Sequence, residues 1–214
     1  MSTEPAHRRR AALVLARHSA GTSAPSRVDP AVWGRAALAD TYEVLADLSG
    51  VASGIVGPTS VQELLWPGAL LLADQPLAEL AERLTPDVDE LVVVPADVPD
   101  LPGLVLAKTF KVLHRSDVVV APARNGPGCV ALGLRLPLAP WLVRELLDLD
   151  DDLSARLPAA APGRSSFALA PDWHRLRRPA DLTRLDPGLE GWEETRALLP
   201  ASGGWGSNGG GQQW

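Results

Sequence analysis

The stretch that most constrains the fold of this 214-residue chain is residues 91–103, with the sequence LVVVPADVPDLPG. Its first four residues are apolar and mostly β-branched, which is typical of a short strand buried inside a sheet. Two acids, Asp97 and Asp100, follow directly, and a helical period begins at residue 104. In an open α/β sheet, a ligand site usually lies where a buried strand ends and a helix follows. We therefore expect the functional site near these two acids.

Strands and helices alternate along most of the sequence. We predict strands at 11–16, 51–56, 64–66, 91–94, 117–121, 129–136 and 166–170, and helices at 30–48, 76–84, 101–114, 141–149, 179–185 and 191–199. Such alternation predicts an α/β fold in which one Rossmann-like, mixed but mostly parallel sheet carries helices on both faces. The strand at 129–136 follows its predecessor too closely for a crossover helix, so we expect it to run antiparallel.

The length fits a single domain, which we place at residues 11–200. A polar N-terminal arm, residues 1–10, precedes it, and a glycine-rich tail, residues 201–214, follows it. The composition of the tail cannot build a core, so we expect the tail to be flexible. The single cysteine, Cys129, stands in an apolar run, which favours a buried structural thiol over a nucleophile.

Charge and hydropathy exclude several classes of partner. The formal net charge of −6 argues against a nucleic-acid-binding domain. No apolar run approaches the length that spans a bilayer, so we expect no membrane partner and a cytoplasmic location. Lys108 and Lys111 are the only lysines, so a fixed cation beside a phosphate would have to be a guanidinium.

The acidic run formed by Asp148 and residues 150–152 has two interpretations. Clustered carboxylates suggest a metal site, but adjacent acids at a helix end face different ways. We therefore interpret the run as solvated surface. His18 and His114 are interpreted in the same way, as surface or structural residues and not as ligands.

Four segments of the chain resemble motifs of one known superfamily. They are PADVPDLP at 95–102, DVVVAPARNGPGCVALGLRLP at 117–137, SR at 26–27 with ADT at 39–41, and PADL at 179–182. Through them, residues 11–186 resemble the glycosyltransferase-A-type, or nucleotide-diphospho-sugar transferase, superfamily. Within it, the chain is similar to small bacterial glycosyltransferase-like proteins and to the guanylyltransferases that activate phospholactate or phosphoenolpyruvate.

The resemblance implies that the strand ends hold the diphosphate of a nucleotide or nucleotide-sugar. It makes Asp97 and Asp100 the candidate catalytic acids. Asp97 would also hold a metal, because Mg²⁺ or Mn²⁺ on carboxylates commonly neutralises such a leaving group. Local chemistry offers an alternative in which Asp100 caps the following helix and Asp97 fixes the turn.

Nucleotide or phosphate binding is assigned to Arg27 in the first loop, Asn125 in the 124–128 turn, and Arg175 and Arg177 near the C-terminus. Guanidiniums bind phosphate through paired, charge-assisted hydrogen bonds. The alternatives are a salt bridge to Asp29 or a surface site for Arg27, a tight turn at Asn125, and a solvent-exposed basic stretch around residue 175.

The chain also departs from the superfamily pattern. Pro25 stands where the family has a lysine, Asn125 replaces the acid of an Asp-Gly-Gly turn, and Arg175 and Arg177 replace two late acids. Two functions remain open for such a chain. One is glycosyl or nucleotidyl transfer with weakened or lost metal dependence, acting on a nucleotide or nucleotide-sugar.

The second function is that of a catalytically degenerate member of the fold, which acts as a binding or assembly protein. Its support is the joint loss of the lysine, the turn acid and the late acids. The tail carries Trp205 and Trp214, which would suit docking onto a protein partner or a second copy of the chain.

Overall fold

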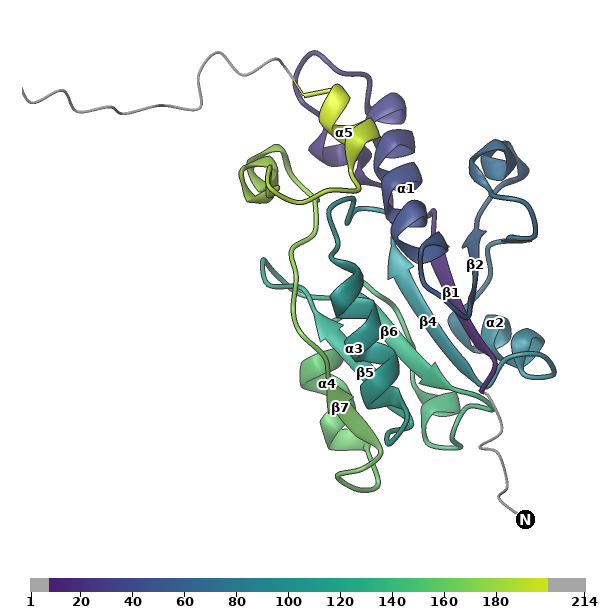
Figure 1. The fold of residues 1–214 in the computed structure, drawn as a ribbon. Coiled ribbons are helices and arrows are strands. Elements are labelled where there is room, and N and C mark those ends of the chain that lie inside the picture. Colours follow the sequence, from purple (N-terminus) through teal and green to yellow (C-terminus); the bar gives the residue numbers. More distant parts are fainter. Residues whose placement is uncertain (1–7, 200–214) are drawn as a thin grey trace, which may run out of the picture.

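A seven-stranded sheet forms the centre of the molecule in the computed structural model, which describes residues 8–199 (Figure 1). Its order is β3-β2-β1-β4-β6-β5-β7. The strands are β1 Arg10–Leu15, β2 Val51–Val56, β3 Leu70–Leu72, β4 Glu90–Pro95, β5 Val118–Pro122, β6 Cys129–Arg135 and β7 Phe167–Leu169. Only β6 runs antiparallel to its neighbours in this sheet. The predicted mixed, mostly parallel α/β sheet is confirmed, including its one reversed strand.

Helices cover both faces of the sheet. They are α1 Pro30–Ala46, α2 Leu77–Leu84, α3 Gly103–Leu113, α4 Leu153–Ala160 and α5 Glu193–Ala197, with 3₁₀ turns η1 Ala20–Ser23, η2 Thr59–Leu64, η3 Leu142–Arg144 and η4 Pro179–Arg184. Alternate residues of β1 show the two faces: Leu13 belongs to the apolar cluster that includes residues of α2 and α4, whereas Val14 belongs to the cluster that includes residues of α1 and α3. None of the described helices is long and apolar enough to cross a membrane.

Strand β4 is buried along its whole length, as a strand between two neighbours and two helical layers must be. Its first residue, Glu90, is fully buried, and its carboxylate accepts hydrogen bonds from Arg8 (2.7 Å) and Arg10 (2.9 Å). These contacts compensate the buried charge and tie the start of the described chain to the sheet. Residues 1–7, the rest of the predicted arm, lie outside the described residues.

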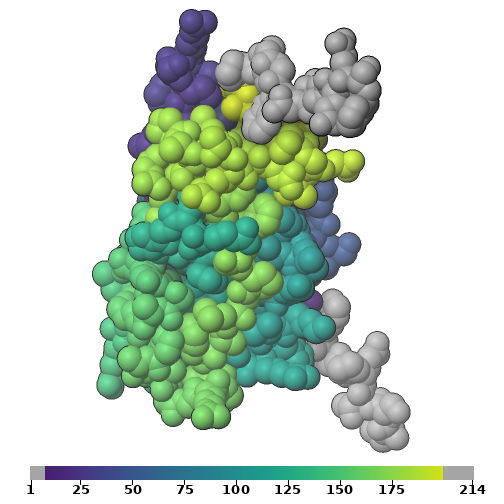
Figure 2. Space-filling view, turned by 90° about the vertical axis from the view of Figure 1, so that its left-hand side faces the viewer, coloured from purple at the N-terminus to yellow at the C-terminus, as the bar shows by residue number. Residues whose placement is uncertain are grey.

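A third apolar cluster closes the end of the sheet at which the parallel strands finish. Trp33 of α1 packs there against Leu176, Leu185 and Trp192 from the C-terminal part of the chain. Figure 2 shows this part, in yellow-green, lying over the upper end of the molecule. The C-terminal segment therefore covers the strand ends where the site was expected.

Two sequence predictions of secondary structure are wrong. The third strand is not at 64–66 but at Leu70–Leu72, after a turn in which Gly68 adopts φ +87°. The helix predicted at 141–149 is only the 3₁₀ turn η3, because Leu147 and Leu149 are buried at alternate positions and the Leu149 carbonyl accepts from the Cys129 amide (2.9 Å). The helix instead begins after Asp152, whose side chain caps α4.

Asp40 joins two helices that are distant in sequence. It is fully buried in α1, and its two carboxylate oxygens accept from the amides of Glu194 (3.1 Å) and Thr195 (2.7 Å) at the start of α5. Burial raises the pKa of Asp40 from 3.8 to about 6, although these amide hydrogen bonds oppose the shift.

The first prediction concerns Asp40 and pH. Because the pKa is higher in the folded than in the unfolded chain, the native state binds the extra proton between pH 3.8 and about 6. The Asp40 contribution to the free energy of unfolding therefore falls as pH rises through this window, and is constant above it. In urea titrations, the free energy of unfolding of wild type should fall relative to that of Asp40→Asn as the pH is raised from 4 to 6. A pH-independent difference would contradict the assignment.

Candidate functional site

The candidate site lies in the turn that follows β4. Asp97 is 2 % exposed there, and both of its carboxylate oxygens accept from the Nε of Arg175, at 2.7 and 3.0 Å. The Arg175 side chain is itself 1 % exposed, and its Nη1 donates to the Leu149 carbonyl at 2.9 Å. The acid at the strand end is thus paired with a cation inside the protein.

Backbone contacts bring Arg175 to this position. The Leu176 amide donates to the Asp97 carbonyl (2.8 Å), so the segment after β7 crosses the end of β4. The side-chain amide of Asn125 donates to the Arg175 carbonyl (2.8 Å) and accepts from the Arg175 amide (3.0 Å). This two-way pairing fixes the backbone at Arg175 and occupies the polar atoms of Asn125.

A second acid, Asp150, joins the two arginines. Its Oδ1 lies 2.8 Å from Arg175 Nη1 and 3.1 Å from Arg177 Nη2, while Arg177 Nη1 donates to the Pro127 carbonyl (2.6 Å). Gly128 beneath them has φ +92°, and a side chain there would meet both Arg177 and the backbone of Asp150. The glycine-rich turn before β6 therefore lets Asp150 and Arg177 approach the strand ends.

Burial and the neighbouring guanidiniums act in opposite directions on the pKa values of the two acids, Asp97 and Asp150. Burial raises the pKa of Asp97, and Arg175 opposes that shift without cancelling it. Partial burial opposes ionisation of Asp150 as well, but Arg175, His18 and Arg177 outweigh it and hold its pKa below the ordinary value. Burial and the neighbouring Arg175 guanidinium lower the pKa of Arg177. The pairings thus keep Asp150 ionised.

Asp100 does not cap the helix that follows it. Helix α3 has Pro102 at its N-cap and no side-chain cap. Asp100 is buried, and its oxygens accept from Trp173 Nε1 and the Asp186 amide (both 3.3 Å), with His174 Nε2 3.0 Å from Oδ1. Its contacts hold the C-terminal segment against the turn, and its predicted catalytic role stays a prediction.

Arg27 is not brought into this cluster. It is exposed in the turn before α1 and makes no ion pair with any described residue, so of its two alternatives the structure shows the surface site and not the bridge to Asp29. Asp29 instead accepts from the amides of Ala31 and Val32 as the N-cap of α1. The tail residues Trp205 and Trp214 lie outside the described residues.

The contacts of Asp97 do not favour a metal ion in this arrangement. Carboxylates bind Mg²⁺ or Mn²⁺ through free oxygen lone pairs at close range. Both Asp97 oxygens already accept from the Arg175 guanidinium, so an ion on this carboxylate would lie against a buried positive charge. The metal role of Asp97 stays a prediction.

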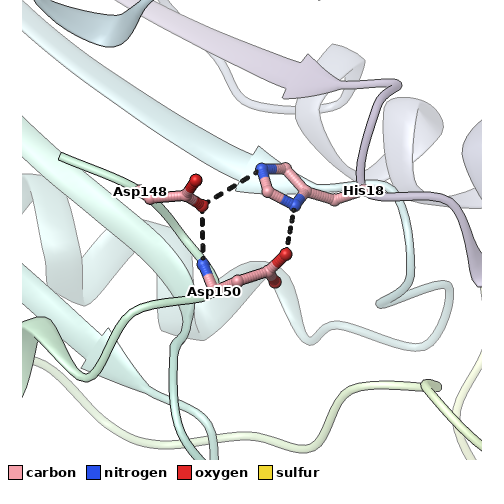
Figure 3. Close-up of side chains that lie close together, drawn as sticks. All are labelled: His18, Asp148 and Asp150. Atoms are coloured by element: carbon pink, nitrogen blue, oxygen red, sulfur yellow. Dashed lines mark hydrogen bonds and ion pairs between the residues drawn. The ribbon is translucent and has the colours of Figure 1, made fainter.

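The structure adds His18 to the site, although the sequence favours a surface or structural role for it. His18 follows β1, is 8 % exposed, and has its Nδ1 3.2 Å from Asp150 Oδ2 (Figure 3). Its other nitrogen faces Asp148. Two features of the sequence could have indicated this role. His18 directly follows a core strand, and Asp148 and Asp150 are two residues apart in the acidic run.

Cys129 and a surface hollow lie apart from this chemistry. Cys129 is buried as predicted, and burial raises the pKa of its thiol to about 12, so it stays protonated. A hollow of about 780 Å³ lies at the opposite end of the sheet, between the start of β1 and α3, lined by Arg10, Val51 and Phe110 among others. It contains none of the residues at the strand ends.

Comparison with protein families gives one match. Residues 51–147 match the model of a family described as "Uncharacterized protein conserved in bacteria (DUF2064)". This segment includes β4, the Asp97 turn and the 124–128 turn, but not Arg175 or Arg177. A search of curated proteins found no match.

Solved structures with a similar fold include proteins described as transferases. A protein of Desulfovibrio desulfuricans G20, provisionally described as a nucleotide-diphospho-sugar transferase, is 17 % identical, with a TM-score of 0.64, over 89 % of this chain and 96 % of its own. A 4-diphosphocytidyl-2C-methyl-D-erythritol synthase of Anaerococcus prevotii DSM 20548 is 10 % identical, with a TM-score of 0.55, over 89 % and 96 %.

A cytidylyltransferase of Leptospira borgpetersenii serovar Hardjo-bovis is also 10 % identical, with a TM-score of 0.53, over 90 % of this chain and 94 % of its own. The resemblance to the glycosyltransferase-A-type superfamily is therefore confirmed as a fold. The closer relation to guanylyltransferases stays a prediction.

The second prediction tests the buried pair. Arg175→Met leaves the Asp97 charge buried without a partner, and should lower the free energy of unfolding by about 3–5 kcal/mol in urea at pH 7. Adding Asp97→Asn should restore part of this loss, because the orphaned charge is then removed.

The matched control is Arg124→Met, which breaks the exposed pair with Asp172 (2.9 Å) and should cost less than about 1 kcal/mol. If Arg175→Met and Arg124→Met cost the same, the Asp97–Arg175 pair is not a buried ion pair in solution.

Proposed function

We propose that this chain, which has the fold of the nucleotide-diphospho-sugar transferases, binds a nucleotide or nucleotide-sugar over the carboxyl ends of its strands. It acts there as a glycosyl or nucleotidyl transferase that does not require a metal on Asp97. The observation that carries the proposal is the pairing of Asp97 with Arg175, beside a second guanidinium on Arg177. A fixed cation occupies the place where the superfamily pattern has acids.

Asp150 occupies the position that a diphosphate would take between the two arginines. One of its oxygens contacts both guanidiniums, at 2.8 and 3.1 Å, as a phosphate oxygen can. The Asp150 side chain is 57 % exposed, so rotating it into solvent costs little compared with moving either Arg175 or Asp97. We infer that a diphosphate binds by displacing this carboxylate.

The charges support such an exchange. With Asp150 in place, two carboxylates (Asp97 and Asp150) face the two guanidiniums, and the cluster has no surplus of positive charge for an anion. Moving the Asp150 carboxylate away leaves Arg177 with a free Nη2 and only Asp97 beside the two arginines. A diphosphate would then meet a net positive site at the end of β4.

A second candidate function is a catalytically degenerate fold member that binds or assembles without transfer. It is favoured by the same contacts, because Nε and Nη1 of Arg175 and both Nη atoms of Arg177 already donate to protein acceptors. Binding and turnover must therefore be measured separately.

The third prediction follows from the role of Asp150. Removing its charge by Asp150→Asn should tighten nucleotide binding about tenfold, since a competing contact of about 1.4 kcal/mol is lost. Arg177→Gln should weaken binding about tenfold for the opposite reason. Asp151→Asn is the matched control, because Asp151 belongs to the same acidic run but faces Arg156 (3.8 Å), and it should leave the affinity unchanged.

The measurement is isothermal titration calorimetry with nucleoside triphosphates and UDP-, GDP- and dTDP-sugars, first in EDTA and then with Mn²⁺. Binding in EDTA that follows the predicted order of variants supports the proposed site. Absence of binding by wild type and by Asp150→Asn would overturn it. Binding without product formation, followed by chromatography of the nucleotides, would assign the chain to the degenerate class.

A further inference from the structure

A histidine and two acids from distant parts of the chain converge beside the arginine cluster. His18 comes from the loop after β1, whereas Asp148 and Asp150 come from the segment between β6 and α4 (Figure 3). One potential ligand atom from each residue lies within 4.8 Å of the others. The Asp150 amide donates to Asp148 Oδ1 (2.9 Å), which fixes the relative positions of the two acids.

One nitrogen of His18 has no hydrogen-bond partner among the described residues. Nδ1 faces Asp150 Oδ2, but the buried Nε2 accepts and donates nothing, and the nearest acid, Asp148 Oδ1, is 3.9 Å away. The side chain is 5 % exposed, so solvent does not readily satisfy this atom. A buried polar atom without a partner costs free energy, and calls for an explanation.

The spacing suits an ion better than a direct hydrogen bond. Two ligand atoms held about 2.1 Å from one ion are separated by roughly 3.0–4.2 Å, depending on the angle between them. The 3.9 Å between Nε2 and Asp148 Oδ1 falls in this range. The carboxylates of Asp148 and Asp150 are 46 % and 57 % exposed, which lets them turn toward an ion and lets water complete its coordination.

We propose that His18, Asp148 and Asp150 hold a divalent transition-metal ion, with Nε2 as the ligating nitrogen of His18 and with the Asp150 carboxylate turned toward the ion from its place at Nδ1. The imidazole selects Mn²⁺ or Zn²⁺ over Mg²⁺ and Ca²⁺, which prefer an all-oxygen shell. The site is distinct from Asp97, whose oxygens are held by Arg175. It does not rest on the proposed transferase function, because it requires no nucleotide.

The other acids of the run do not contribute. Asp151 faces Arg156, and Asp152 accepts from Ser154 Oγ (2.7 Å) and the Ala155 amide (3.1 Å) as the N-cap of α4. Adjacent acids do face different ways, as the sequence indicated, but the two that are separated by one residue meet at His18.

The fourth prediction is tested on the full chain, without a histidine tag and stripped with EDTA. Mn²⁺ binding is followed by electron paramagnetic resonance of the free ion, and Zn²⁺ binding by calorimetry. Wild type should bind one ion per chain, with Mg²⁺ at least about tenfold weaker. His18→Ala and Asp148→Asn should each weaken binding by at least about tenfold, and Asp151→Asn should not change it.

Asp148→Asn keeps the test decisive even where His18→Ala disturbs folding, because Asp148 is half-exposed and its substitution leaves the core intact. Nitrogen hyperfine coupling on bound Mn²⁺, lost in His18→Ala, would identify the imidazole ligand. The proposal is overturned by absence of stoichiometric binding to wild type, or by equal affinities of Asp148→Asn and Asp151→Asn.

Discussion

The ion pair between Asp97 and Arg175 is the contact on which the arrangement of the strand ends depends. Each partner is almost completely buried, so neither could be ionised there without the other. The pair joins the end of the central strand to the C-terminal segment, and the Leu176 amide bonds the same turn through its backbone. Trp33, Leu176 and Trp192 form an apolar cluster at the same end of the sheet. The chemistry and the closure of the fold therefore share one set of residues.

Asp150 is the residue through which the proposed anion site and the proposed cation site communicate. One of its oxygens faces the two guanidiniums, and the other faces His18. An ion on His18 and Asp148 would draw the Asp150 carboxylate toward itself and away from the arginines. A diphosphate would favour the same displacement. The two ligands would thus bias one half-exposed side chain in the same direction, which is the physical requirement for positive coupling between sites.

The sequence was sufficient to predict most of the fold, because buried strands and capped helices leave strong local patterns. The β-branched run before Asp97 and the Asp29-Pro30 helix start are of this kind, and both appear as predicted. The segment 141–152 was predicted poorly, because its backbone bonds to the distant Cys129 and its leucines are buried at alternate positions. Local propensity carries no information on such long-range contacts.

The same distinction applies to the site. Asp97, Arg175, Arg177 and Asn125 were singled out from the sequence and do lie together, but the resemblance to a superfamily supplied the topology that joins them. Their mutual pairing was not predictable, because residue types do not show which donor meets which acceptor. His18 was not assigned to the site from the sequence, because a single histidine in a loop is usually a surface or structural residue. Only the fold places it beside two acids.

A crystal structure of the chain with UDP and Mn²⁺ tests the central claim most directly. The account predicts that Asp97 remains on Arg175, that the diphosphate contacts Arg177, and that Asp150 has rotated away from both guanidiniums. A Mn²⁺ ion coordinated by Asp97, with the Arg175 side chain expelled from the turn, would contradict it.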